Sequence, residues 1–373
     1  MRYQNGGVTH KSIISQYILE TMTQCGDVPM NRPTIADLAK AANVSVSTVN
    51  RILAGSASVR TATIQRVQNA ADEIGYYGLG TIEARKQESM PSYRLGFLLQ
   101  QSTRELYQLI GQKIREAAAG WRDARIDAAV EFVDHLEPEN IAARLKTLGR
   151  ACDAAAVVAG DHPLIGQAIQ ALRHQGRPVV AYITDQSASE RAGYVGADNW
   201  KLGRTAAWFI AQTTCHPGRV QVLIGNHRYQ CQDISEASFR SYMREHAGHL
   251  GIEDSLPTHE EPKEAHRLIS KLLAERDDLA GVYVAGGGIS GVLQAVREAP
   301  EERRRRLRVV CRDIGPETRR GLAEGLITAA LCHPLERTSD QLIQTMIDAI
   351  RQTNDGVILQ RTLPFEIITP ENL

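Results

Sequence analysis

The stretch from Pro33 to Ile74 constrains the fold most, because its apolar residues recur at helical spacing around a short break. Thr34 is followed three residues later by Asp37, a capping-box arrangement that satisfies free N–H groups at a helix start. Residues 43–45 interrupt this helix, and Ser45 can cap a second one. A third helix follows, with one side formed by Ile64, Val67, Ala71 and Ile74. The pattern predicts a helix-turn-helix unit.

The second of these helices carries the side chains that would face a partner. Its apolar face consists of Val49, Ile52 and Leu53. With that face turned inward, the outer face presents Val46, Ser47, Asn50 and Arg51. Arginine can reach a guanine edge or a phosphate, serine either of these, and valine a thymine methyl group. A small helical module with a solvated face would show the same pattern, so the residues alone leave both interpretations open.

The exact order of residues narrows the choice. Residues 34–53 read TIADLAKAANVSVSTVNRIL and residues 59–76 read VRTATIQRVQNAADEIGY. Residues 32–77 thereby resemble the headpiece of LacI-type transcriptional regulators, except that Asn50 stands where the family usually has Ser. The resemblance implies a double-stranded DNA operator as partner. It also implies DNA contacts from Thr34, Ser45, Val46, Ser47, Thr48, Asn50, Arg51 and Arg60.

The segments on either side of the headpiece depart from that family. Residues 1–31 form an N-terminal extension in which the apolar spacing predicts a short helix over residues 12–24. Residues 78–92 form the linker, where relatives carry a hinge helix with a Leu that wedges into the minor groove. Arg85 falls at the place of that Leu. Either Ile82 serves as the wedge, or Arg85 and Lys86 hold phosphates; we count Arg85 among the predicted DNA contacts.

From residue 93 to residue 373 the pattern changes to short apolar runs that alternate with helical stretches. Such alternation predicts parallel sheets with helical crossovers. This length is too great for one small sheet, so we expect α/β architecture in two doubly wound lobes with a ligand cleft between them. The run 303–306, with four consecutive arginines, is expected to be a solvated helix end or loop.

This part resembles the type-1 periplasmic-binding-protein domain that LacI-type regulators carry. The resemblance rests on RLGFL at 94–98, YVGADN at 194–199, the stretch 281–291 and the ending 364–373. It implies a small-molecule effector of sugar or polyol type, bound by side chains at the ends of the strands. The candidate contacts are Thr103, Tyr107, Asp185, Asp233, Gly286, Gly287, Asp313 and Cys332. Arg312 could hold an anionic group, whereas Asp233 stands where sugar binders often place Arg.

One alternative concerns the glycines at 286–291, which match G-x-G-x-x-G after a predicted strand and before a helix. Asp313 follows after a further strand, which completes the outline of a dinucleotide fingerprint. The match comes late in the chain, after several strand–helix units, so a nucleotide-dependent enzyme is the second hypothesis. The chain has no H-E-x-x-H, G-x-S-x-G or P-loop motif. We therefore expect a regulator that is not an enzyme and uses no cofactor or metal.

Charge and cysteine content agree with a DNA-binding regulator. The formal net charge is zero, yet residues 32–94 hold eight Arg or Lys against five Asp or Glu. A modest basic surplus suits a homodimer that doubles its phosphate contacts. The six cysteines show no C-x-x-C pair, which is typical of a reducing compartment. The N-terminus lacks the pattern of a signal peptide and no apolar run approaches the roughly 20 residues of a membrane span, so a cytoplasmic location is expected.

Overall fold

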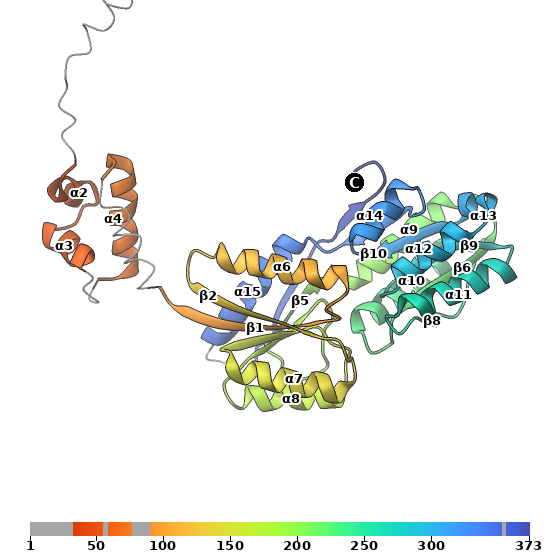
Figure 1. Cartoon of the computed structure of the whole chain (residues 1–373), viewed down its shortest axis with the longest axis horizontal. Coiled ribbons are helices and arrows are strands. Elements are labelled where there is room, and N and C mark those ends of the chain that lie inside the picture. The colour runs from red at the N-terminus through yellow and green to blue at the C-terminus, as the bar shows by residue number, and fades with distance from the viewer. Residues whose placement is uncertain (1–32, 55–58, 77–89, 353–355) are drawn as a thin grey trace, which may run out of the picture. The chain divides into compact units, whose positions relative to one another are not determined.

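A computed structural model describes residues 33–54, 59–76, 90–352 and 356–373. The chain divides into two compact units, Met1–Met90 and Pro91–Leu373, which are described separately (Figure 1). The predicted helix at 12–24 and nearly all of the linker, including Ile82 and Arg85, lie outside the described residues. The finer division of the chain at residues 31, 77 and 92 stays a prediction.

The described residues of the headpiece form three helices, α2 (Ile35–Ala41), α3 (Val46–Ala54) and α4 (Thr61–Ile74). The predicted capping box forms, because the Thr34 N–H donates to the Asp37 carboxylate at 2.9 Å and the Asp37 N–H donates to the Thr34 hydroxyl at 3.3 Å. Asn43 makes the turn between α2 and α3 with a φ of 52°, a left-handed conformation that Asn tolerates. Leu38, Val49 and Val67 are fully buried where the three helices meet. The helix-turn-helix prediction is confirmed.

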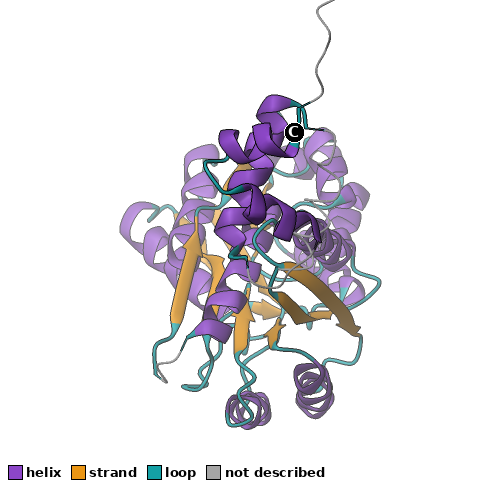
Figure 2. Cartoon of the chain, turned by 90° about the vertical axis from the view of Figure 1, so that its left-hand side faces the viewer, coloured by secondary structure: helices purple, strands orange, loops and turns teal. Residues whose placement is uncertain are grey.

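The first lobe of the larger unit contains a parallel sheet of six strands in the order β12-β5-β4-β3-β1-β2. The strands are β1 (Ser92–Gln100), β2 (Arg125–Val133), β3 (Ala154–Val157), β4 (Val179–Tyr182), β5 (Gly193–Ala197) and β12 (Leu359–Leu363). One face is covered by α6 (Glu105–Ala119) and α15 (Leu335–Arg351). The other is covered by α7 (Pro138–Ala151) and α8 (Pro163–Arg173). The strands lie between these helix layers (Figure 2).

The second lobe contains a sheet of order β13-β11-β10-β9-β6-β7, with β8 paired to β6. Its strands are β6 (Gly218–Ile224), β7 (Leu250–Ile252), β8 (Leu256–Pro257), β9 (Leu279–Val284), β10 (Arg308–Arg312), β11 (Ala329–Cys332) and the antiparallel β13 (Glu366–Ile368). The faces are covered by α9 (Asn199–Thr213) and α10 (Gln230–His246), and by α11 (Pro262–Glu275), α12 (Ile289–Glu298) and α14 (Pro316–Ala323). The prediction of two doubly wound lobes is confirmed.

The chain passes between the lobes after β5, after β11 and after β12, so neither lobe is continuous in sequence. The arginine run forms the short helix α13 (Glu301–Arg306), which has no buried residue, in agreement with the expected solvated helix end. Across the described ranges, no helix combines the length and the apolar character that spanning a membrane would require.

Candidate functional site

The first site is the outer face of α3. Val46 is 45% exposed, and Ser47, Asn50 and Arg51 are exposed beside it. The Ser45 hydroxyl caps the helix, because it accepts the Thr48 N–H at 3.2 Å. Short side chains at a capped helix start allow the backbone to approach a partner closely.

The Arg51 side chain lies back along its own helix in this structure. Its Nε donates to the Ser47 carbonyl and its Nη2 to the Thr48 hydroxyl, both at 3.4 Å. Bonds of this length are weak, so the guanidinium is able to turn outward toward a base or phosphate. Thr34 and Arg60 are also exposed, and Thr48 is half-buried. Each predicted DNA-contact residue that the structure describes is therefore exposed or half-buried on the headpiece.

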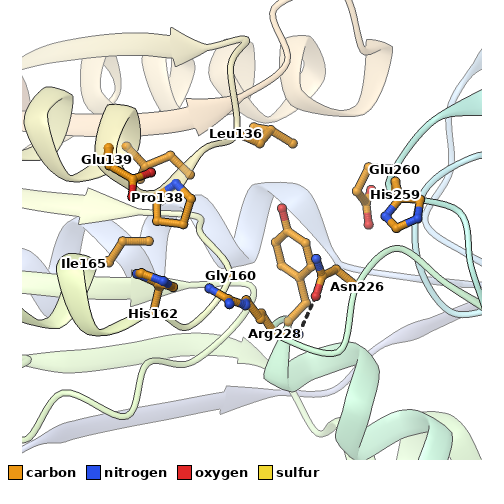
Figure 3. Close-up of a pocket in the computed structure, with 12 residues that line it drawn as sticks. Leu136, Pro138, Glu139, Gly160, His162, Ile165, Asn226, Arg228, His259 and Glu260 are labelled. Carbon is orange, nitrogen blue, oxygen red and sulfur yellow. Dashed lines mark hydrogen bonds between the residues drawn. The ribbon is translucent and has the colours of Figure 1, made fainter.

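The second site is the cleft between the two lobes, where the carboxyl ends of the parallel strands meet. An outer cavity of about 590 Å³ is bordered by residues 101–106 after β1 and by the first turns of α12 and α14. A cavity of about 430 Å³ lies at the starts of α7 and α8, where His162, Arg228 and Glu260 are among the bordering residues (Figure 3). An inner cavity of about 40 Å³ shares Glu260 with both.

Arg104 of the first lobe and Glu260 of the second form an ion pair across the cleft, with Nη1 and Oε2 2.5 Å apart. The Gln232 side chain donates to the other Glu260 oxygen at 2.8 Å, so the carboxylate has a partner on each oxygen. Burial lowers the pKa of Arg104, but the charge of Glu260 outweighs this effect and raises it above its ordinary value. Arg104 therefore stays charged, and its contact with Glu260 links the lobes.

Two tyrosines reinforce this link. Tyr107 at the start of α6 and Tyr229 before α10 both donate their hydroxyl to the side-chain oxygen of Gln100, at 3.2 and 3.1 Å. Arg104 also lies over the Tyr107 ring, with 5.3 Å between the guanidinium carbon and the ring centroid. Burial raises the pKa of both phenols, so they stay protonated and act as donors.

Asp313 lies at the end of β10 and is held by His333 after β11. It accepts from the His333 backbone N–H at 3.0 Å and contacts the His333 ring nitrogen Nδ1 at 2.6 Å. Burial alone would raise the pKa of Asp313, but His333 and Arg312 lower it well below its ordinary value. Asp313 has a φ of 60°, a conformation that Asp adopts more easily than most residues.

The structure brings five of the eight predicted effector contacts to these cavities. They are Thr103, Tyr107, Gly286, Gly287 and Asp313. The other three border none of them. Asp185 is held by Arg191 through two bonds of 2.7 and 3.1 Å, Asp233 is exposed and contacts His227, and Cys332 is 1% exposed beneath the surface. A strand end supplies many side chains, and only some of them point toward the cleft.

Several bordering residues were not anticipated from the sequence, chief among them Arg104, Tyr229, Gln232 and Glu260. Arg104 directly follows the predicted contact Thr103 after β1. Counting one more residue beyond the end of that strand would have included it. Glu260 follows β8, a strand of two residues that leaves no periodic signal. Its role becomes visible only when the two lobes are placed together.

Close packing accounts for the glycines at 286–291. A Cβ atom at Gly286 would lie 2.3 Å from the backbone nitrogen of Gly225, and one at Gly291 would lie 1.8 Å from the carbonyl oxygen of Pro262. Gly288 caps α12 with a φ of 104°, which disfavours any side chain. These glycines are needed without any bound pyrophosphate. Within the described residues, no group of three or more His, Cys, Asp or Glu side chains is arranged to hold a metal ion.

Comparison with known families agrees with this organisation. The sequence model described as "Periplasmic binding protein domain" matches residues 95–354, and that described as "Bacterial regulatory proteins, lacI family" matches residues 34–78. The chain belongs to the LacI type of regulatory proteins. As a LacI-type regulator it combines a DNA-binding headpiece with a periplasmic-binding-protein-like domain, and the matches give no support to the enzyme alternative.

Solved structures resemble the larger unit of this LacI-type regulator. A solute-binding protein from Agrobacterium vitis with bound α-D-tagatopyranose is 19% identical, with a TM-score of 0.67 over 75% of this chain and 95% of that one. A glucose-galactose binding protein from Geobacillus stearothermophilus is 20% identical, with a TM-score of 0.67 over 76% and 99%. A Bacillus halodurans protein with bound myo-inositol is 16% identical, with a TM-score of 0.65 over 76% and 96%. At these identities the likeness establishes the fold. No curated protein matched.

Proposed function

We propose that this regulator binds a near-palindromic DNA operator as a homodimer, and that a sugar- or polyol-like effector in the interlobe cleft sets its operator affinity. The observation that carries the proposal is the presence, in one chain, of an exposed helix face at Val46–Arg51 and a polar cleft between two lobes. The solved relatives named above bind tagatose, glucose or galactose, and myo-inositol, which supports a polyhydroxy effector. Its place of action is the cytoplasm, where an operator is accessible.

The proposed mechanism couples the two sites through the lobes. An effector that binds more tightly to one arrangement of the lobes shifts the chain toward that arrangement. In a dimer, such a shift changes the spacing of the two headpieces and hence the fit to the two half-sites. We infer a regulator rather than a nucleotide-dependent enzyme because packing accounts for the glycines at 286–291.

Binding of labelled duplexes tests the DNA part of the proposal. A library of random duplexes is first selected on the full-length protein, and the affinity for the selected sequence is then measured by fluorescence anisotropy. Arg51→Ala should weaken specific binding by about 1–3 kcal/mol and relax the preference at one base pair. The matched control is Arg66→Ala, which removes the same charge from the exposed side of α4 and should leave base preference unchanged. Equal behaviour of the two variants would contradict the assignment of α3 as the recognition helix.

A further inference from the structure

The cleft contains a buried cation, Arg312, two of whose nitrogen atoms form no hydrogen bond within the described residues. Arg312 at the end of β10 is 8% exposed and borders both the outer and the inner cavity. Its Nη1 reaches the carbonyl of Cys231 at 3.4 Å, whereas Nε and Nη2 are buried and have no hydrogen-bond partner among the described residues. Two buried guanidinium nitrogens without hydrogen bonds are costly, so the arrangement favours an acceptor that arrives from outside the chain.

The acidic side chains near Arg312 are already occupied. Glu260 accepts from Arg104 and Gln232, and Asp313 is held by His333. Arg312 is also the one residue bordering the three described cavities whose buried polar atoms lack a hydrogen-bond partner. The group that remains available to a ligand at the inner cavity is therefore a positively charged hydrogen-bond donor.

The sizes of the two adjoining cavities limit what can bind there. The inner cavity of about 40 Å³ has room for a group of a few atoms but not for a sugar ring, since a single water needs about 10–15 Å³ of such space. The outer cavity of about 590 Å³ is bordered by the acidic residues Asp134, Glu261 and Glu317. Asp134 also accepts the Ser102 N–H, and Glu317 also pairs with Arg297 and Arg320. Ionised carboxylates only accept hydrogen bonds, so this larger space suits a body that is rich in hydroxyl groups.

We propose that the effector is a polyhydroxy carboxylate, with its carboxylate on Arg312 in the inner cavity and its hydroxyl-bearing chain in the outer cavity. This proposal rests on the proposed function, in which the effector occupies the interlobe cleft. A carboxylate matches the planar guanidinium fork through two parallel hydrogen bonds, and it supplies the charge that hydroxyl groups lack. The acidic residues around the outer cavity and the guanidinium of Arg312, which borders both cavities, would thus bind the two ends of one molecule.

Calorimetric titration of the full-length protein with matched pairs of compounds tests this assignment. The pairs are D-gluconate with D-glucitol, D-galactonate with galactitol, and D-glucuronate with D-glucose. At least one acid should bind about 10- to 100-fold more tightly than its neutral counterpart. The carboxamide of that acid should lose this advantage, and this control does not depend on any variant that fails to fold.

Two variants then assign the effect to Arg312. Arg312→Gln should abolish the preference for the acid, whereas Arg267→Gln, on the exposed side of α11 and outside the three cavities, should preserve it. Failure of every acid to bind, or a neutral compound that binds as tightly as its acid, would overturn the proposal. Release of operator by a neutral sugar would overturn it while leaving the proposed function intact, whereas the absence of any duplex preference would overturn the proposed function.

Discussion

The Arg104–Glu260 ion pair joins the lobes, and Glu260→Gln should destabilise the larger unit by about 2–3 kcal/mol. The substitution keeps the size of the side chain but removes its charge. Glu260 is almost completely buried, with a side-chain exposure of 4%, whereas the Arg104 side chain is 26% exposed. Loss of the carboxylate therefore leaves a mostly buried cation without its partner.

The magnitude follows from this burial. Two unit charges about 4 Å apart attract by about 4 kcal/mol at the effective dielectric constant of about 20 that suits protein sites. Removing one partner of a fully buried pair costs about 3–5 kcal/mol. Water reaches part of Arg104 and compensates some of the loss, so the expected value of about 2–3 kcal/mol lies at or just below the lower limit of that range.

Urea unfolding followed by tryptophan fluorescence measures this change. Trp121, Trp200 and Trp208 all lie in the unit Pro91–Leu373, so the signal reports that unit even in the full-length chain. A double-mutant cycle with Arg104→Met isolates the interaction between the two side chains. Glu264→Gln, which breaks the exposed pair with Arg267 on α11, is the matched control and should leave the transition unchanged. A coupling energy below about 0.5 kcal/mol would refute the view that this pair holds the lobes together.

Three further predictions concern single residues. Thr34→Ala removes the capping box and should lower headpiece stability by about 1 kcal/mol. Thermal unfolding of the isolated residues 32–77, followed by circular dichroism, measures this change, and Thr61→Ala, whose side chain is exposed, is the control. An unchanged melting curve for Thr34→Ala would contradict a stabilising cap. Asp233→Asn should leave the effect of the effector on operator binding unchanged, because Asp233 is exposed outside the cavities. Loss of that effect would show that Asp233 does belong to the effector site. Asp313 has a folded-state pKa below its ordinary value of 3.8, so its contribution to stability is present above that value and is lost as the pH falls below it. Asp313→Asn should therefore flatten the decline of unfolding free energy in acid, and an unchanged slope would contradict the assigned pair with His333.

The headpiece was predictable because the interactions that form it are local. The cap between Thr34 and Asp37 spans three residues, and the buried face of α3 follows from the 3.6-residue helical period. The two-lobed α/β fold was predictable for a similar reason, since buried parallel strands and their covering helices each leave a continuous apolar signal. The arginine run at 303–306 was correctly placed at the surface from its charge alone.

Tertiary structure decided which strand-end residues face the cleft. The sequence analysis treated Asp185, Asp233 and Asp313 alike, as candidate effector contacts. In the structure Arg191 holds Asp185, Asp233 is exposed and contacts His227, and only Asp313 borders one of the cleft cavities. Glu260 meets Arg104 across 156 positions of chain, a contact that no local pattern records. Periodicity reports which side of an element is buried, whereas the partners of a buried charge depend on how the two lobes come together.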